Sequence, residues 1–510
     1  MKKILFFVLP LLFVLPAQAQ FAQEEEPVKL GAVVVTATRD PREDRTTPAN
    51  VTVVTAEEIR HSGATTVVEV LEKLESIQFR TYSGNASQAM IDMRGFGGDN
   101  PFGKTLVTLD GSRLNRPDMS SINWLSIPVN TIERIEILRG PGSVLYGDAA
   151  VGGVINIVTK KGKGKPAFNA SLLAGSYGLH NERAGVIGAE GKWTYALTGE
   201  NHYNSGYRDR SRYSSQGGGF EVGWAAHDLL NLSLGVSFNR TDYQMPGALT
   251  KEQMQENRRQ YQPAMPLYWM NANDDNDGRD KYTNVNLGVK SFWGAFGRME
   301  VNLTYGRKDL ESNMPSWASS WLPYSYVYSD TNSETLGITP RYTLERDVWK
   351  FRNQVIIGMD YYSEPYQKKY FNDRERSVAL STASLRRQST GYFIRDELSL
   401  LAGLVLSFGY RFEQTSISGS NKDFVAPANN FDNEKTYRAR AYEAGLTWLW
   451  GKKSKAYARY ATVYRIPFLD EVASFNGYST PTPFLTSLEE EKGVSMETGM
   501  EYYPMENLKL

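Results

Sequence analysis

The chain of 510 residues contains no cysteine, which excludes a disulfide scaffold and thiolate metal sites. Its four histidines are scattered and suggest no cluster of imidazole ligands. Neither sign of charge is in excess, because 57 Lys and Arg residues balance 57 Asp and Glu residues, so nothing points to nucleic acid as a partner. After the first residues, no apolar run reaches the roughly 18 residues of a membrane-spanning helix. If the chain sits in a membrane, it must do so as a β-barrel.

Catalytic signatures are also missing from the sequence. No Ser/His/Asp set and no HExxH motif stands out, and carboxylate pairs are too common here to indicate acid or base catalysis. We therefore expect a protein that is not an enzyme and that has no resident cofactor.

The first 19 residues are typical of a secretory signal peptide. Lys2 and Lys3 precede an apolar run, and an A-x-A cleavage site follows at 17–19. The polar residues 20–45 are predicted to form a flexible leader, in which residues 30–36 are β-prone. Such an extended segment with free backbone groups can add as a strand to the edge of a partner's sheet, although read alone it is an ordinary strand.

Residues 46–160 are predicted to form a compact α/β domain. Helices are expected at 56–63 and 67–74, the second with apolar residues at helical spacing. The glycine-rich stretch 132–159 has β-branched residues on both sides of its turn, which predicts two strands. It does not match a phosphate loop, because Leu145 replaces the third glycine of GxGxxG and no Gly-Lys-Ser/Thr follows.

Residues 161–165 are predicted to be a solvated linker, and residues 166–510 an incomplete antiparallel β-barrel. Apolar and polar residues alternate in segments such as 231–239 and 404–413, which indicates strands with lipid on one side and a polar lumen on the other. About fourteen such strands are expected, with a fifteenth beginning at Leu508.

Unequal connections favour a barrel over a soluble β-sandwich, which would also show alternation. Short turns at 293–296 and 401–403 alternate with long polar stretches at 244–281 and 367–386. Short periplasmic turns and long outer loops would produce this asymmetry.

Several motifs identify a family. The stretch from Ile132 to Thr159, IERIEILRGPGSVLYGDAAVGGVINIVT, resembles the most recognisable segment of the plug domain of TonB-dependent outer-membrane receptors. Arg94-Gly-Phe96 and Leu109-Asp-Gly111 resemble two further plug signatures, in family order. The resemblance implies a transmembrane antiparallel β-barrel, of 22 strands in the family, with an N-terminal α/β plug inside its lumen. Because the pattern stops after 14–15 strands, we expect the chain to be a fragment or a truncated reading frame.

The resemblance also implies a function and a location. It predicts a receptor in the outer membrane of a Gram-negative bacterium that imports a scarce small-molecule ligand, with a ferric siderophore as first candidate and cobalamin as second. Haem is disfavoured, because Tyr464-Arg-Ile-Pro467 departs from the motif of haem receptors and no histidine follows His227. A passive outer-membrane pore and a surface adhesin are the rival classes. Partners implied are outer-membrane lipid and TonB, energised by ExbB and ExbD; the expected TonB box residues are Leu30, Val33, Val34, Val35 and Thr36.

Three groups of residues are candidates for the site. By resemblance and strand parity, ion pairs between plug and barrel are expected among Arg94, Arg139, Glu413, Glu443 and Glu497. Aromatic residues of the outer loops can stack on a flat or chelated ligand, and we expect this role for Tyr261, Trp269, Trp317, Trp321 and Tyr324, with a membrane-interface belt as the alternative. The acidic run at 273–278 is close to a calcium-binding loop, although Asn273 and Asn284 occupy the first and twelfth ligand positions.

Overall fold

The computed structural model of the chain describes residues 46–75, 77–81, 86–96, 102–265, 271–318, 326–400, 403–451, 453–473, 483–505 and 508, and the backbone of 34–35 and 42–43. The predicted signal peptide and three residues of the predicted TonB box, Leu30, Val33 and Thr36, lie outside this range. Within it, no helix is long and apolar enough to cross a membrane.

The N-terminal domain is a small α/β unit, and both predicted helices are confirmed. Its five-stranded sheet has the order β3-β8-β9-β6-β7, with β4 and β5 paired beside it. Its elements are β3 (Asn50–Thr55), α1 (Ala56–His61), α2 (Val67–Glu75), β4 (Gln78–Thr81), β5 (Ala89–Asp92), β6 (Thr105–Leu109), β7 (Ser112–Arg113), β8 (Ile132–Arg139), α3 (Ser143–Tyr146) and β9 (Gly153–Thr159). The predicted strands on either side of the glycine-rich turn are β8 and β9, and they pair antiparallel.

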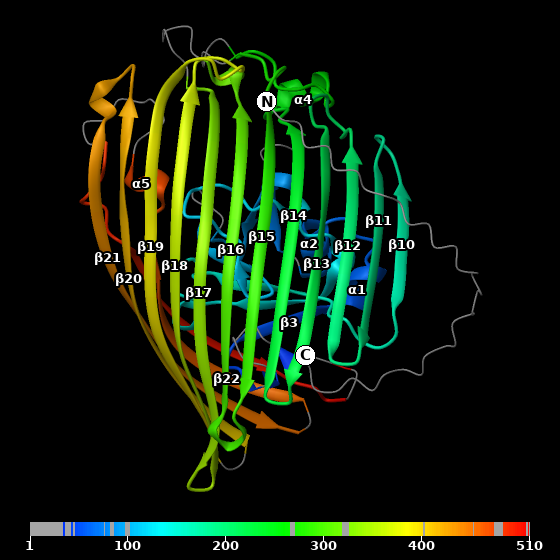
Figure 1. Cartoon of the computed structure of the whole chain (residues 1–510), viewed down its shortest axis with the longest axis vertical. Coiled ribbons are helices and arrows are strands. Elements are labelled where there is room, and N and C mark those ends of the chain that lie inside the picture. The colour runs from blue at the N-terminus through cyan, green and yellow to red at the C-terminus, as the bar shows by residue number, and fades with distance from the viewer. Residues whose placement is uncertain are drawn as a thin grey trace, which may run out of the picture.

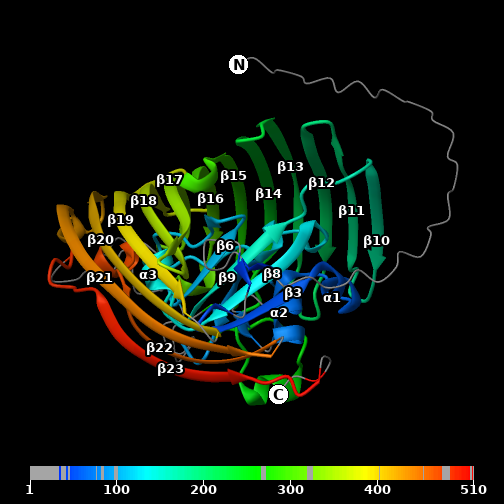
Figure 2. The same cartoon turned by 90° about the horizontal axis from the view of Figure 1, so that it is seen from below.

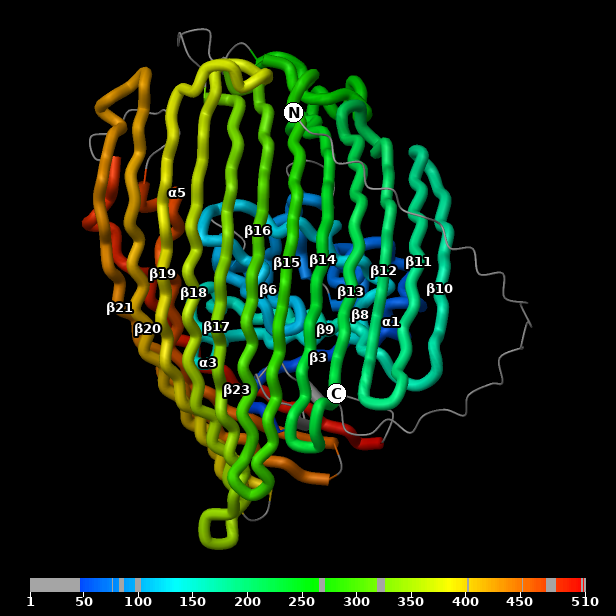
Figure 3. The backbone as a smooth tube through the Cα atoms, in the orientation of Figure 1, coloured from blue at the N-terminus to red at the C-terminus, as the bar shows by residue number. Residues whose placement is uncertain are grey.

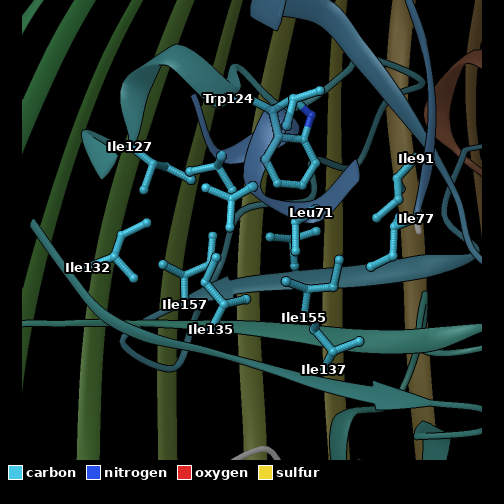
Figure 4. Packing of buried hydrophobic residues seen from close by; sticks show 14 of the residues in the cluster. Leu71, Ile77, Ile91, Trp124, Ile127, Ile132, Ile135, Ile137, Ile155 and Ile157 are labelled. Carbon is cyan, nitrogen blue, oxygen red and sulfur yellow. The ribbon is translucent and has the colours of Figure 1, made fainter. Parts of the chain in front are cut away.

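A core of its own holds this domain together (Figure 4). Leu71 from α2, Ile135 from β8 and Ile155 from β9 are fully buried in one cluster. Trp124 closes the cluster, and its indole Nε1 donates to the carbonyl of Ala89 at 2.8 Å, so its polar edge is satisfied. Ile135 of β8 and Ile155 of β9 lie in runs of consecutive buried residues, so both strands that flank the glycine-rich turn are anchored in the core of the domain.

The rest of the chain forms one antiparallel sheet of fourteen strands in sequence order. The sheet curves around the N-terminal domain, which lies on its concave side (Figures 1 and 2). Two short helices, α4 (Lys251–Glu256) and α5 (Leu469–Val472), lie in loops. The strands are β10 (Ala167–Ala174), β11 (His180–Glu190), β12 (Trp193–Asn204), β13 (Tyr213–His227), β14 (Leu230–Gln244), β15 (Asp277–Phe292), β16 (Arg298–Asn313), β17 (Tyr328–Val348), β18 (Phe351–Phe371), β19 (Ala379–Ser399), β20 (Leu404–Asp423), β21 (Phe431–Trp450), β22 (Ser454–Arg465) and β23 (Glu491–Glu501).

The edges of this sheet are β10 and β23, which do not pair with one another among the described residues. Leu508 forms only an isolated bridge with Met505, so the fifteenth strand predicted there is absent from the part of the chain that the structure describes.

Side chains alternate between the two faces of the sheet, as the sequence predicts. Phe238, Phe408 and Trp448 point to the convex face and are 57%, 55% and 54% exposed. Thr241 and Arg411, on alternate positions, are buried on the concave face against the N-terminal domain. The convex face is therefore the apolar, lipid-facing one, and the polar face receives the domain.

One predicted loop is wrong. The polar stretch 367–386 is mostly strand, because β18 runs to Phe371 and β19 starts at Ala379. The tube in Figure 3 shows these long strands rising past the level of the N-terminal domain. Beyond the apolar band both faces of a strand are polar, so alternation in the sequence no longer marks the strand.

Candidate functional site

The contact between the N-terminal domain and the inner face of the sheet is the candidate functional site. The glycine-rich turn presents α3 to strands β19–β22, with Val144, Leu145 and Tyr146 buried. Leu145 and Tyr146 share a cluster with Ile356 of β18 and Phe393 of β19. A turn that carries no long polar side chain can approach the wall closely, which explains the glycines on either side of α3.

A buried ion pair anchors the turn. Asp148 Oδ2 accepts from the Arg387 guanidinium of β19, and both side chains are almost fully buried. Asp148 Oδ1 accepts from the backbone N–H of Ile466 at 2.9 Å, so the carboxylate joins β19 and the end of β22. Burial alone raises the pKa of the Asp148 carboxyl, but the charges of Arg387 and Arg113 outweigh it and hold that pKa below its usual value. Sequence reasoning missed this pair, although Asp148 lies inside the most recognisable motif.

Glu413 and Glu443 face inward as predicted, but the prediction that they pair with plug arginines is wrong. Glu413 binds Arg411 of its own strand at 2.7 Å and accepts from the hydroxyl of Tyr464 at 2.8 Å. Inward residues two positions apart on one strand point the same way, so Arg411 and Glu413 can pair within the wall without a partner from the domain.

Glu443 is likewise held within the wall. It pairs with Arg395 of β19 at 2.8 Å and with Arg459 of β22 at 2.6 Å. Arg459 lies on the neighbouring strand and Arg395 lies two strands away across β20, so strand parity alone does not predict either partner.

Of the two predicted plug arginines, Arg94 contacts the barrel and Arg139 does not, among the described residues. Arg94 Nη2 lies 3.0 Å from Glu497 Oε1 of β23, so the expected contact between plug and barrel is present. Arg139 makes no ion pair with the fourteen-stranded sheet among the described residues. It pairs with Glu75 at 2.5 Å and donates to Thr52 at 2.7 Å, and both of these partners are in the N-terminal domain. Asn50 and Thr52 of β3 lie beside the end of β8, so Arg139 finds its partners within its own sheet and the prediction for it is wrong.

We expect the contact between Arg94 and Glu497 to contribute little to the free energy of unfolding. The Arg94 side chain is 38% exposed, and solvent screens such a pair, so removing it should cost about 1 kcal/mol or less. A double-mutant cycle of Arg94→Gln and Glu497→Gln on urea unfolding measures the coupling. A coupling energy above about 3 kcal/mol would contradict this screened arrangement, as that is the range of buried pairs.

A segment between β22 and β23 folds inward onto the domain. We call residues 466–473 the inward segment. Its backbone N–H of Leu469 donates to the carbonyl of Pro117 at 3.0 Å, and Asp470 Oδ2 accepts from the N–H of Met119 at 2.8 Å. Burial raises the pKa of the Asp470 carboxyl; Lys368 opposes this shift and Asp118 adds to it. The sequence of this region differs from the haem-receptor motif, but no local pattern in it predicts the contact with the domain.

The predicted TonB box is described only in its backbone. Val34–Val35 forms β1, which pairs antiparallel with β2 (Arg42–Glu43). These two residues are extended, and one side of them is paired with the chain that leads to the N-terminal domain. The role of residues 30–36 as a TonB box stays a prediction.

The predicted ligand aromatics are only partly described. Trp317 is 57% exposed after β16, and Tyr261 is half-buried in the loop after β14. Trp269, Trp321 and Tyr324 lie outside the described residues. Their role in binding a ligand stays a prediction.

Two carboxylates of the acidic run after β14 form salt bridges with Arg374. Arg374, between β18 and β19, binds Asp277 at 2.6 Å and Asp275 at 3.1 Å, so a calcium ion would compete with a guanidinium for both carboxylates. Among the described residues, no group of three or more His, Asp or Glu side chains is arranged to hold a metal ion. Calcium in this loop stays a prediction.

A cavity of about 600 Å³, lined by both apolar and charged side chains, lies between the domain and the wall, on the side of the short turns. Its lining includes Asp110 and Lys161 from the domain side and Glu221 from β13. Lys161 closes one side of it by binding Glu221 at 2.5 Å and Asp110 at 3.6 Å. The domain therefore fills the concave face incompletely and leaves a space beside β13–β16.

Comparisons with known proteins agree with this architecture. Residues 43–154 match the family model of the TonB-dependent receptor plug domain, and residues 192–510 match that of the TonB-dependent receptor-like β-barrel. A vitamin B12 transporter, BtuB of Vibrio cholerae, is 33% identical over 198 residues, which are 38% of this chain and 31% of that protein. The chain thus aligns with about a third of the length of this curated relative.

Solved structures show the same fold. The unliganded ferric citrate transporter FecA superposes with a TM-score of 0.74 at 17% identity, over 90% of this chain and 68% of that one. The siderophore receptor PiuA of Acinetobacter baumannii gives a TM-score of 0.72 at 15% identity, over 94% and 73%. Since the barrel match alone spans more than half of the sequence, the chain belongs to the TonB-dependent receptor family of Gram-negative outer-membrane proteins.

Proposed function

We propose that the chain imports a scarce metal chelate across the outer membrane with energy delivered by TonB. The observation that carries this proposal is the position of the N-terminal domain on the inner face of the sheet, held by the buried pair of Asp148 and Arg387. A plug anchored in this way blocks free diffusion, so passage requires work on the plug. No catalytic role is proposed.

The connectivity suggests where that work would be applied. The leader that carries residues 30–36 enters β3, which is an edge strand and pairs only with β8 in the plug sheet. Lys455 of β22 also holds the start of this strand, through the carbonyl of Ala49 at 3.2 Å. A pulling force on the leader would therefore act first on the hydrogen bonds between β3 and β8. The strands at the centre of the sheet would separate only after this edge strand had detached.

Cobalamin is the better supported ligand and a ferric siderophore the second. The relative with 33% sequence identity is a vitamin B12 transporter, whereas the ferric citrate transporter at 17% identity and the siderophore receptor at 15% identity support the fold alone. This reverses the order suggested by the sequence, and the reversal rests on a comparison that spans 38% of the chain.

Accumulation of labelled ligand in energised cells tests the proposal. Cells that make the chain should concentrate cobalt-labelled cobalamin, or failing that an iron-labelled siderophore, and deletion of residues 30–36 should abolish this. Deletion of an equally long leader stretch, residues 20–26 of the precursor, placed after a preserved cleavage site, is the matched control and should leave uptake intact.

The rival classes give different results in the same assay. Uptake that continues without residues 30–36 would indicate a passive pore. Binding to the cell surface without accumulation, for every chelate tested, would indicate an adhesin. Either outcome overturns the proposal.

A further inference from the structure

The cavity of about 600 Å³ between the plug and the wall has a volume typical of sites for small molecules. The inward residues that line it on β13–β15 include Gly223, Ser233 and Gly288, whose side chains are too short to fill the space. On the opposite side of the sheet, Arg387 and Arg411 meet the glycine-rich turn of the plug. The plug is therefore anchored to one side of the wall and stands away from it on the other.

A row of charged side chains crosses the wall of this cavity. Lys290 of β15, Glu300 of β16 and Arg341 of β17 are cross-strand partners, and all three line the cavity. Glu300 pairs with Arg341 and lies 3.5 Å from Lys290, so two cations share one carboxylate. Arg298 adds a third cation at 3.8 Å from Glu300, although Glu345 also binds it at 3.1 Å. Around Glu300, positive charge therefore exceeds negative charge.

The cations of this row keep donors that no protein carboxylate uses. The Nε atom of Arg341 is buried and has no hydrogen-bond partner among the described residues. The Lys290 side chain is 49% exposed, so Glu300 holds its ammonium group only in part. The next row of the wall, toward its middle, is small or polar and uncharged: Ser233, Gly288, Asn302 and Thr339. Cationic donors beside neutral ones are the groups that bind an oxyanion.

Two other carboxylates of the cavity do not neutralise this row. Glu221 of β13 and Asp110 of the plug bind Lys161, at 2.5 Å and 3.6 Å. Within the described residues, no ion pair joins either of them to Lys290 or Arg341. The positive excess of the row is therefore directed into the cavity.

We propose that Lys290 and Arg341 form a binding site for an oxyanion, a phosphate or carboxylate group, on the periplasmic side of the plug. The planar guanidinium matches two oxygens of such a group, the ammonium supplies a second charge, and Asn302 and Thr339 can donate to a further oxygen. Glu300 competes with the anion for both cations and so limits the affinity of the site. The cavity lies on the side of the short turns, which face the periplasm. This site does not depend on which ligand the receptor imports.

Binding of inorganic phosphate to the folded, purified full chain in detergent tests this assignment, with isothermal titration calorimetry as the readout. Arg341→Gln should bind phosphate roughly tenfold more weakly, because a charged hydrogen-bonding partner is lost. Glu300→Gln should bind phosphate roughly tenfold more tightly, because the competing carboxylate is gone. A row that only holds the wall together would not give opposite changes in the two variants.

Glu345→Gln is the matched control. Glu345 is a carboxylate of β17 that binds Arg298 and Arg352, each at 3.1 Å, and it does not line the cavity. Its removal should leave phosphate affinity within about twofold of the wild type, because it touches neither Lys290 nor Arg341. An equal gain of affinity in Glu345→Gln and Glu300→Gln would show a general effect of charge and would overturn the proposal.

Thermal unfolding separates binding from a folding defect. Phosphate should raise the Tm of Glu300→Gln by more than that of the wild type, since a ligand of the folded state stabilises it according to its affinity. Lys290→Gln changes a half-exposed side chain and should also weaken binding, so the test does not rest on Arg341 alone. Unchanged affinity in all three cavity variants, or full displacement of phosphate by chloride at equal concentration, would overturn the proposal.

A free anion of the periplasm and the anionic group of an imported chelate share this chemistry, and competition in the same assay distinguishes them. Cobalamin carries a phosphate ester, so displacement of inorganic phosphate by cobalamin from the wild type would assign the site to a ligand that leaves the plug. Phosphate that stays bound at saturating cobalamin would assign the site to a free anion. Both outcomes retain the site, and they identify its occupant.

Discussion

Replacing Asp148 with asparagine should weaken the docking of α3 by roughly 3 kcal/mol, the lower end of the range for breaking a buried ion pair. The substitution keeps the shape of the side chain and an oxygen for the N–H of Ile466, but removes the charge that compensates Arg387. Glu364 lies 3.9 Å from Arg387 and offers partial compensation, which is why the lower end applies. Hydrogen exchange of residues 143–149 measures the free energy of opening at this contact.

The same carboxylate predicts a dependence on pH. Its pKa is lower in the docked state than in the free chain, so its contribution is complete about one pH unit above the ordinary pKa of about 4 and is lost as the pH falls from there through the lower pKa of the docked state. Opening of α3 should therefore become easier below about pH 5 in the wild type. In Asp148→Asn this part of the pH dependence should disappear.

A matched substitution separates the buried pair from charge in general. Glu133→Gln removes a plug carboxylate whose partner Lys163 is 75% exposed, and we expect a change below about 1 kcal/mol. If Glu133→Gln and Asp148→Asn had equal effects on exchange at 143–149, the buried pair would not be what anchors the turn.

The architecture of this chain was predictable from sequence because its signals are local. Alternation along β14 and β20 marked their membrane-facing parts, and the run from Ile132 to Thr159 fixed both the strands and the turn of the plug. Periodicity failed only where both faces of a strand are polar, as in the upper parts of β18 and β19.

The partners of the interfacial charges were harder to predict. Strand parity correctly predicted that Glu413 and Glu443 face inward, and it also allows Glu413 to pair with Arg411 of its own strand. The arginines that bind Glu443 lie on other strands, at positions that only the register between strands reveals. Arg387 and Asp148 are 239 residues apart, and neither lies in a pattern that specifies the other. The ion pair between Arg94 and Glu497 was predictable because both positions match motifs of the family.

Gly147 should tolerate no side chain, and Gly147→Ala should cost about 2–6 kcal/mol. Its backbone, at φ +74° and ψ −138°, is in a region essentially restricted to glycine, which contributes about 1–3 kcal/mol. A Cβ would also meet Glu413 Oε2 and lie 2.8 Å from Arg411 Nη2, and overpacking of that kind adds about 1–3 kcal/mol. Arg411 cannot move away cheaply, because it is bound to both Asp360 and Glu413.

Gly111→Ala is the matched control for that substitution. Gly111 also lies in the plug at a positive φ of +83°, but no atom lies within 4 Å of the position that an added methyl group would occupy. It should show the backbone cost alone, about 1 kcal/mol. Urea unfolding of the plug and hydrogen exchange at residues 143–149 measure the loss of stability in each of the two variants. The clash at the wall accounts for the difference between the two variants, so equal losses would mean that α3 does not rest against Arg411 and Glu413. A larger loss for Gly147→Ala than for Gly111→Ala would show that the turn packs against the wall too closely at this residue to admit one more methyl group.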